Sequence, residues 1–456
     1  MLATVALAVA FTCWRYLHPR IRTATYDEVI AVLPKELLEP QAPDNDAEIR
    51  LAALFNVLQS FEIKELSLLS AHPGRTSLEA MGAADKVWHD GRFAKVMRIL
   101  KSGPIQFPVV QSRGRRRGYI GPRDPNELYS KLKQMTKGLV DSASAYEASG
   151  DLGEAMFCLR SLILISDRIW HLNGGLVHYF VSASIEVSAL RAVSDYARNP
   201  MSPIADCQEL LRLLPASPEE DRRIAECLRI HFQQNILPKL PDPYRNSDDR
   251  DVSASNTIPS LDAADPAFET SYDALATSKE IGKVYAIEMA NTLRPFSRYD
   301  NSAEKIQRNA RNRLPMPPGR DDVDQRLSQV ERIRYRVATY NTDNYFGRVM
   351  IGYDIDDKEL VNRSAVCRAM RSAVRVLLAS RLYRNSHNGE LPKDEDGFIP
   401  ILRSWPNDPY TGNPLIYRRS NSVVYSIGKN LIDNGGSIAG FNNDSLDIGL
   451  QLTFDR

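Results

Sequence analysis

Apolar residues recur every three or four positions along most of the chain between Tyr26 and about Leu240. Leu51, Leu54 and Leu58 illustrate this spacing, which places their side chains on one face of a helix. A second amphipathic run covers residues 78–100. The pattern predicts a helical body over residues 23–240, built as an irregular bundle that includes hairpins of helices.

Two helices should meet within residues 143–163, "ASAYEASGDLGEAMFCLRSLI". Gly150 and Asp151 form the expected corner, and the segment has the composition of one tetratricopeptide-type hairpin. No second clear copy occurs at the expected spacing, although repeats of this kind need several stacked copies. We therefore expect a single hairpin within the bundle.

Residues 166–197 are apolar on nearly every side, which is typical of the central buried helix of a unit. His178 and Glu186 lie in this segment, about two helical turns apart. They are candidates for a catalytic acid–base pair. We expect instead that both are buried, hydrogen-bonded polar side chains, because this is the more frequent role of such residues.

The rest of the chain divides into three parts. Residues 241–268 are rich in Asp, Ser and Pro and have no apolar period, which indicates a linker or mobile loop. Residues 269–356 form a second helical segment. Residues 357–456 begin with a long helix and continue with "LIYRR" and "SVVYSI", whose alternation predicts a β-hairpin. The predicted fold class is mainly α, followed by a small α+β module.

Oxygen-bearing side chains gather in the loop after this hairpin. Asn430, Asp433, Asp444 and Asp447 lie in a stretch rich in glycine and asparagine. Calcium takes about six to eight oxygen ligands and accepts irregular loops. These four residues are therefore the predicted calcium ligands, although the residue order of an EF-hand is absent.

Residues 1–22 give the evidence on the cellular location of the protein. Leu2–Trp14 is uncharged and apolar, and Arg15, Arg20 and Arg22 follow it. The run is shorter than the roughly 20 apolar residues of a spanning helix, and no basic residue precedes it. We interpret residues 1–22 as a hydrophobic anchor or export segment, with a buried N-terminal helix as the alternative.

The composition limits which partners and which catalytic motifs are expected. The 456 residues carry a net charge of +1, so no nucleic-acid partner is expected. Five scattered cysteines without a CxxC pair are typical of small buried apolar side chains. An arginine cluster at residues 113–117 is expected to be a solvated loop. The sequence has no GxxxxGK[ST], HExxH or GxSxG motif, so no catalytic residue is predicted.

Residues 357–456 resemble the C-terminal half of type II secretion major pseudopilins. In that family a long helix precedes a strand pair marked by Asp-Pro, Gly, Pro and Tyr in that order, a Y-S-x-G turn and a closing loop that ends in D-x-x-D-I and binds calcium. The family's aspartate after the Y-S-x-G turn is Asn430 here, and the family's processed N-terminal motif is absent. The matching residues are Asp408, Pro409, Gly412, Pro414, Tyr417, Tyr425, Ser426, Gly428, Asp444, Asp447 and Ile448.

The whole layout is similar to that of exported proteins of planctomycete-type bacteria that have no assigned activity. The resemblance implies a location in the bacterial inner membrane, with the bulk of the chain extracytoplasmic (periplasmic). We expect a structural or interaction protein with protein partners, not an enzyme. Two alternatives stay open: an accessory of a type II secretion or pilus-like assembly, and an enzyme with an unrecognised site in the helical body.

Overall fold

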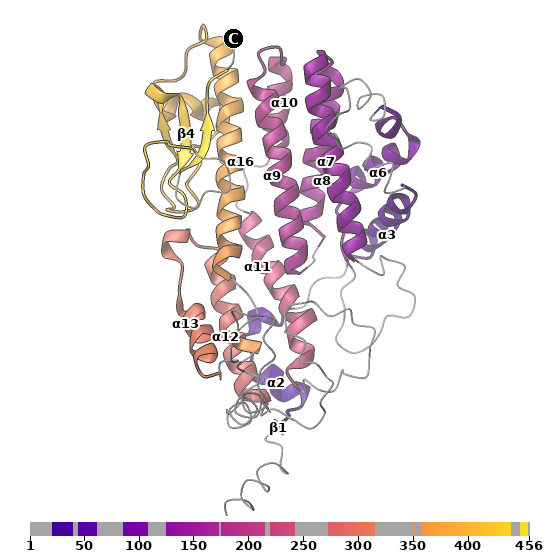
Figure 1. Ribbon diagram of the computed structural model, residues 1–456, viewed down its shortest axis with the longest axis vertical. Helices are drawn as coiled ribbons and strands as arrows, with labels where there is room; N and C mark the ends of the chain where they lie inside the picture. Colours follow the sequence, from indigo (N-terminus) through magenta and orange to yellow (C-terminus); the bar gives the residue numbers. More distant parts are fainter. Residues whose placement is uncertain are drawn as a thin grey trace, which may run out of the picture. The chain divides into compact units, whose positions relative to one another are not determined.

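The computed structural model describes residues 21–39, 44–61, 85–107, 125–172, 175–214, 219–241, 272–314, 348, 350–352, 357–438 and 447–454 (Figure 1). Residues 1–20, the arginine cluster at 113–117 and residues 242–268 of the predicted linker lie outside this description. The prediction of a mainly helical chain with a small α+β module is confirmed.

The chain forms two compact units. Unit 1 comprises Met1–Pro40, His231–Ala290 and Asp300–Asp357, and unit 2 comprises Gln41–Ile230, Asn291–Tyr299 and Lys358–Arg456. The local sequence pattern separates ranges 23–240, 269–356 and 357–456. In the structure, most of the helical body and the C-terminal module belong to one unit, because the long C-terminal helix packs on that body.

Unit 1 contains helices α2 (Tyr26–Val32), α12 (Ala274–Thr292, whose last two residues belong to unit 2) and α13 (Ser302–Asn312). Strand β1 (Ile21–Arg22) pairs in parallel with β2 (Tyr272–Asp273). α2 begins at a capping box in which Thr25 and Glu28 satisfy each other's backbone N–H groups. The Tyr272 hydroxyl, buried in this unit, donates to the carbonyl of Leu240 at 2.5 Å.

Most helices of unit 2 share one hydrophobic core. Leu51, Leu54, Leu58 and Phe61 are all buried in it, as their spacing predicted. The main helices are α3 (Asn45–Gln59), α6 (Gly91–Ser102), α7 (Pro125–Ser149), α8 (Leu152–Trp170), α9 (Leu176–Arg198), α10 (Ile204–Leu213), α11 (Glu219–His231) and α16 (Asp357–Ser386).

The predicted helical hairpin is formed by α7 and α8. Gly150 turns the chain with φ +81°, a conformation that glycine adopts at little cost, and Asp151 caps α8 by accepting from the Glu154 N–H at 3.2 Å. The prediction of one central helix over 166–197 is wrong. α8 ends at Trp170 and α9 begins after Gly175, because glycine is a poor helix former and leaves no side chain to pack there.

α16 connects the C-terminal module to the bundle (Figure 1). Its Arg381 donates to the Pro200 carbonyl at 2.8 Å, just past the C-terminus of α9, and Arg375 donates to the Leu214 carbonyl after α10. Cations near helix C-termini interact favourably with the partial negative charge there. Buried Met370, Ala373 and Leu377 fill the same face of α16.

The module's sheet has strands β3 (Ile416–Arg418), β4 (Val423–Ser426) and β5 (Ile448–Gln451), antiparallel in the order β3–β4–β5. β3 and β4 are the predicted hairpin, whereas β5 was not predicted. All four residues of β4 are buried, which suits the central strand of the sheet. A short helix, α17 (Ile399–Leu402), precedes the sheet.

Candidate functional site

The predicted calcium residues lie in the loop between β4 and β5. Asn430, Asp433 and Asp447 are described by the structure, and Asp444 lies outside the described residues. The two motifs that precede the loop, around Asp408 and Ser426, turn out to be directly connected to each other.

Asp408 is buried and ties the two motifs together. Its Oδ1 accepts from the Ser426 hydroxyl at 2.7 Å and from the Tyr410 N–H at 2.8 Å. Its Oδ2 accepts from the Ile427 N–H at 3.3 Å. The turn at Asp408 is itself closed by the Gly412 N–H, which donates to the Asp408 carbonyl at 2.7 Å. The contacts of Asp408 therefore connect the turn at residues 408–412 to the end of β4.

Asp433 is held from both sides. Its Oδ1 accepts from the Tyr425 hydroxyl at 2.9 Å and the Gly435 N–H at 2.8 Å, and its Oδ2 accepts from Arg418 at 2.8 Å. The hydrogen bond from Gly435 lowers the pKa of Asp433 most, with Tyr425 and Arg418 adding to the effect. The Asp433 side chain thus fastens the loop to β3 and β4.

Asp447 is fully buried at the start of β5. Its Oδ1 accepts from the Asn434 N–H at 3.2 Å and its Oδ2 from the Gly436 N–H at 2.8 Å. Burial raises the pKa of Asp447, and these two N–H groups partly offset the rise. The Asp447 carboxylate thus supplies the acceptors for two backbone N–H groups of the loop.

Asn430 shapes the first part of the loop. Its Oδ1 accepts from the Ile432 N–H at 3.0 Å, and its Nδ2 donates to Asn434 Oδ1 at 2.9 Å. Asn430, Asp433 and Asp447 therefore each accept from donors within the protein. Within the described part of the chain, no three acidic, histidine or cysteine side chains gather as metal ligands. The predicted calcium site also includes Asp444, which lies outside the described residues, so the site stays a prediction.

The same contacts fix an apolar tip, which we define as Leu431 and Ile432. Leu431 has φ +58°, a left-handed conformation that is costly for a bulky side chain. Both side chains are exposed, by 40% and 59%. The tip was not predicted, because its only signal in the sequence is two aliphatic residues between Asn430 and Asp433.

His178 and Glu186 do not form a pair. Glu186 Oε2 accepts from Trp170 Nε1 at 2.8 Å, and Glu186 Oε1 forms an ion pair with Arg371 of α16. His178 lies near Ser182, with 3.3 Å between Oγ and Nε2, and burial lowers its pKa to about 3. The expectation of buried, hydrogen-bonded side chains is met for Glu186, with partners that spacing could not reveal.

One described helix, α9, is long and apolar enough to cross a membrane, with 56% of its most apolar window buried in the protein. That degree of burial is also found in core helices of water-soluble units. No protein-family model, no curated protein and no solved structure matches the chain.

Proposed function

We propose that this protein is a membrane-tethered, extracytoplasmic structural and interaction protein whose C-terminal module contacts another protein through the Leu431–Ile432 tip. The observation that supports the tip contact is that the aspartates of the predicted motifs are engaged in hydrogen bonds within the module. Asp408 closes a turn and binds Ser426, whereas Asp433 and Asp447 bind the loop between β4 and β5. That loop holds two aliphatic side chains in solvent.

The Leu431–Ile432 tip costs free energy in the isolated protein. A left-handed leucine costs about 1–3 kcal/mol, and exposed aliphatic side chains gain nothing in water. The loop contacts of Asn430 and Asp433 nevertheless hold this arrangement. Rigid apolar side chains contribute efficiently to association, because little conformational entropy is lost when they are buried by a partner.

Site-specific photo-crosslinking in the native cells tests this contact. A photoreactive residue at Ile432 should give one discrete adduct, and the same residue at Met201, which is 75% exposed, is the matched control. Adducts of equal number and size at both positions would contradict a specific tip contact. Adducts that contain secretion components would favour the secretion-accessory alternative.

The membrane tether is a separate part of the proposal and rests on Leu2–Trp14 and its basic flank. Fractionation should place the full-length protein in the membrane fraction, and removal of residues 1–22 should release it. Protease added to spheroplasts should degrade the chain if its bulk is extracytoplasmic. Recovery of the intact full-length protein in the soluble cytoplasm would overturn this part.

A further inference from the structure

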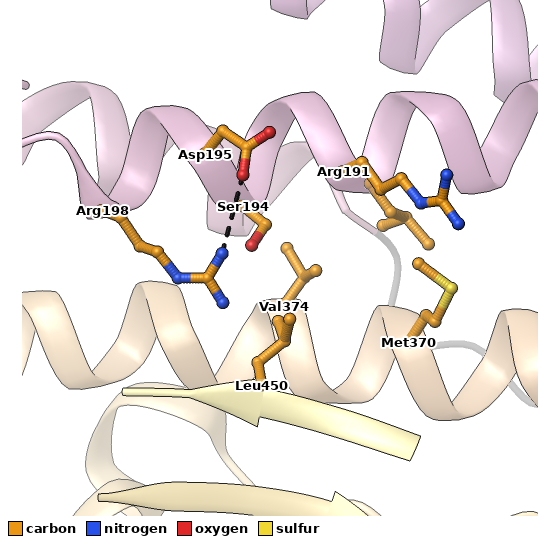
Figure 2. A pocket seen from close by; sticks show the side chains of 8 residues that line it. Arg191, Ser194, Asp195, Arg198, Met370, Val374 and Leu450 are labelled. Carbon is orange, nitrogen blue, oxygen red and sulfur yellow. Dashed lines mark ion pairs between the residues drawn. The ribbon is translucent and has the colours of Figure 1, made fainter. Parts of the chain in front are cut away.

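A pocket of about 180 Å³ lies in unit 2 between α9, α16 and β5 (Figure 2). Its apolar wall is formed by Leu190 of α9, Met370 and Val374 of α16, and Leu450 of β5. Small-molecule sites in proteins are mostly apolar, with a few polar groups that fix the orientation of the ligand. This wall is therefore suited to a small and largely aliphatic ligand.

Ser194 is the polar group inside this pocket. The residue is only 3% exposed, and its hydroxyl is buried without a hydrogen-bond partner in the protein. Of the described residues that line the pocket, Ser194 alone has such an unpaired buried side-chain atom. Figure 2 shows this hydroxyl on the side of α9 that faces Val374 and Leu450. Because an unpaired buried hydroxyl costs free energy, its partner is expected to come from the pocket.

The charged side chains that line the pocket are already engaged. Arg191 and Asp195 are exposed residues of α9. Arg198 forms an ion pair with Asp195, with 3.6 Å between Nη1 and Oδ1, and Arg191 also has a partner within the protein. These charges are therefore not available to select an ionic ligand. A buried hydroxyl beside an aliphatic wall favours a neutral ligand instead, because an unpaired charge is costly to bury.

We propose that this pocket binds a short neutral aliphatic alcohol. The hydroxyl of the ligand pairs with the Ser194 hydroxyl, and its hydrocarbon part packs on Met370, Val374 and Leu450. A hydroxyl both donates and accepts, so it satisfies Ser194 without bringing a charge into the pocket. The size agrees, since a cavity of about 150 Å³ is known to hold a molecule as large as benzene. This site is independent of the Leu431–Ile432 tip, so either proposal can fail alone.

Ligand-observed NMR of the full chain with isoamyl alcohol tests the site. The protein should bind this alcohol saturably, with a dissociation constant below about 10 mM. Isovalerate, which has the same carbon skeleton, should bind at least about 10-fold more weakly, because its charge would lose water without gaining a free cation. A pocket that holds water only would give no saturable binding. That result, or isovalerate binding as tight as that of the alcohol, would overturn the proposal.

Ser194→Ala tests the hydroxyl contact. It should weaken the binding of isoamyl alcohol about 3- to 10-fold, the loss expected for one hydrogen bond. Ser188→Ala is the matched control, because the Ser188 hydroxyl on the same helix already donates to the Ser184 carbonyl at 2.9 Å. This control should bind the alcohol as the wild type does. Equal affinities of the two variants would contradict the role of Ser194.

Val374→Phe tests the location of the hydrocarbon part. The larger side chain should fill the pocket and abolish binding. Because it can also disturb the packing of α16, the result counts only if the circular dichroism spectrum matches that of the wild type; otherwise Ser194→Ala decides. Full binding by folded Val374→Phe would place the alcohol elsewhere and overturn the proposal.

The thermal stability of unliganded Ser194→Ala supplies an independent check. Its melting temperature should equal or exceed that of the wild type, because the substitution removes an unpaired buried hydroxyl. A marked fall in melting temperature would show that the hydroxyl has a structural partner, which would contradict its role as a ligand contact.

Discussion

Glu186 and Arg371 form a buried ion pair between α9 and α16, although they lie far apart in the sequence. Their side chains are only 5% and 8% exposed. Burial lowers the pKa of Arg371 to about 9, so its guanidinium is still charged at neutral pH. Because burying a charge is costly unless it is paired, each partner is needed by the other.

Glu186→Gln should lower the free energy of unfolding by about 3–5 kcal/mol in urea titrations, because it removes the carboxylate that forms the buried ion pair with Arg371. Glu209→Gln is the matched control, since it removes an Arg–Glu pair on the surface and should cost about 1 kcal/mol or less. Addition of Arg371→Met to Glu186→Gln should restore much of the loss. Similar losses for the two single variants would contradict the argument.

The backbone of Leu431 is strained, because its left-handed conformation is adopted at low cost only by glycine. Leu431→Gly should therefore raise the free energy of unfolding by about 0.5–1 kcal/mol. The neighbouring Ile432→Gly should lower it by a similar amount, because Ile432 does not have a positive φ. A loss of stability in both variants, measured by urea titration, would show that the Leu431 side chain has a contact that outweighs the strain.

Among the elements, β5 is held in place by a close approach at Gly449. Gly449 pairs with Tyr425, and a Cβ at this position would lie 2.1 Å from the Val424 carbonyl oxygen. Gly449→Ala should destabilise the protein by about 3 kcal/mol or more and expose the β4–β5 amides to hydrogen exchange. Gly153→Ala in the first turn of α8, where space is available, should be neutral or stabilising. Equal stability of the two variants would contradict the close approach of β5 to β4 at Gly449.

The loop between β4 and β5 carries the calcium prediction. Asn430, Asp433 and Asp447 are engaged within the protein, so Asp444 and backbone carbonyls would have to complete the set. Thermal melts with calcium at about 100 times its dissociation constant should show about 2.7 kcal/mol of stabilisation over chelator. Asp444→Ala should remove this difference, and identical wild-type melts in both conditions would refute the site.

Local pattern predicted the elements whose residues interact nearby in sequence. The α7–α8 hairpin and the β3–β4 pair follow from helical spacing, Gly150 and strand alternation. β5 was missed because it is short, contains Gly449 and acquires its partner only through a long loop. The contact between Glu186 and Arg371 was also missed. Helical spacing relates Glu186 only to residues of its own helix, whereas Arg371 reaches it through the packing of α16 on α9.

At the scale of the whole molecule, buried titratable groups should make stability depend on pH in opposing ways. Burial lowers the pKa of His178 to about 3 and that of His231 to about 4. The unfolded chain then binds more protons than the folded one up to about pH 6.5, so these histidines make stability rise with pH. Glu147 acts in the opposite direction.

Burial raises the pKa of Glu147 from 4.5 to about 7, an effect that Asp195 increases and a hydrogen bond with Asn199 reduces. Between these two values the folded protein holds a proton that the unfolded chain has lost, so stability falls as pH rises. Because Glu147 is partly exposed, we expect about 1–2 kcal/mol from this shift. Glu147→Gln should match the wild type near pH 4 and be more stable by this amount near pH 8. Urea titrations across this range measure the difference, and parallel curves for the two proteins would exclude Glu147 as its source.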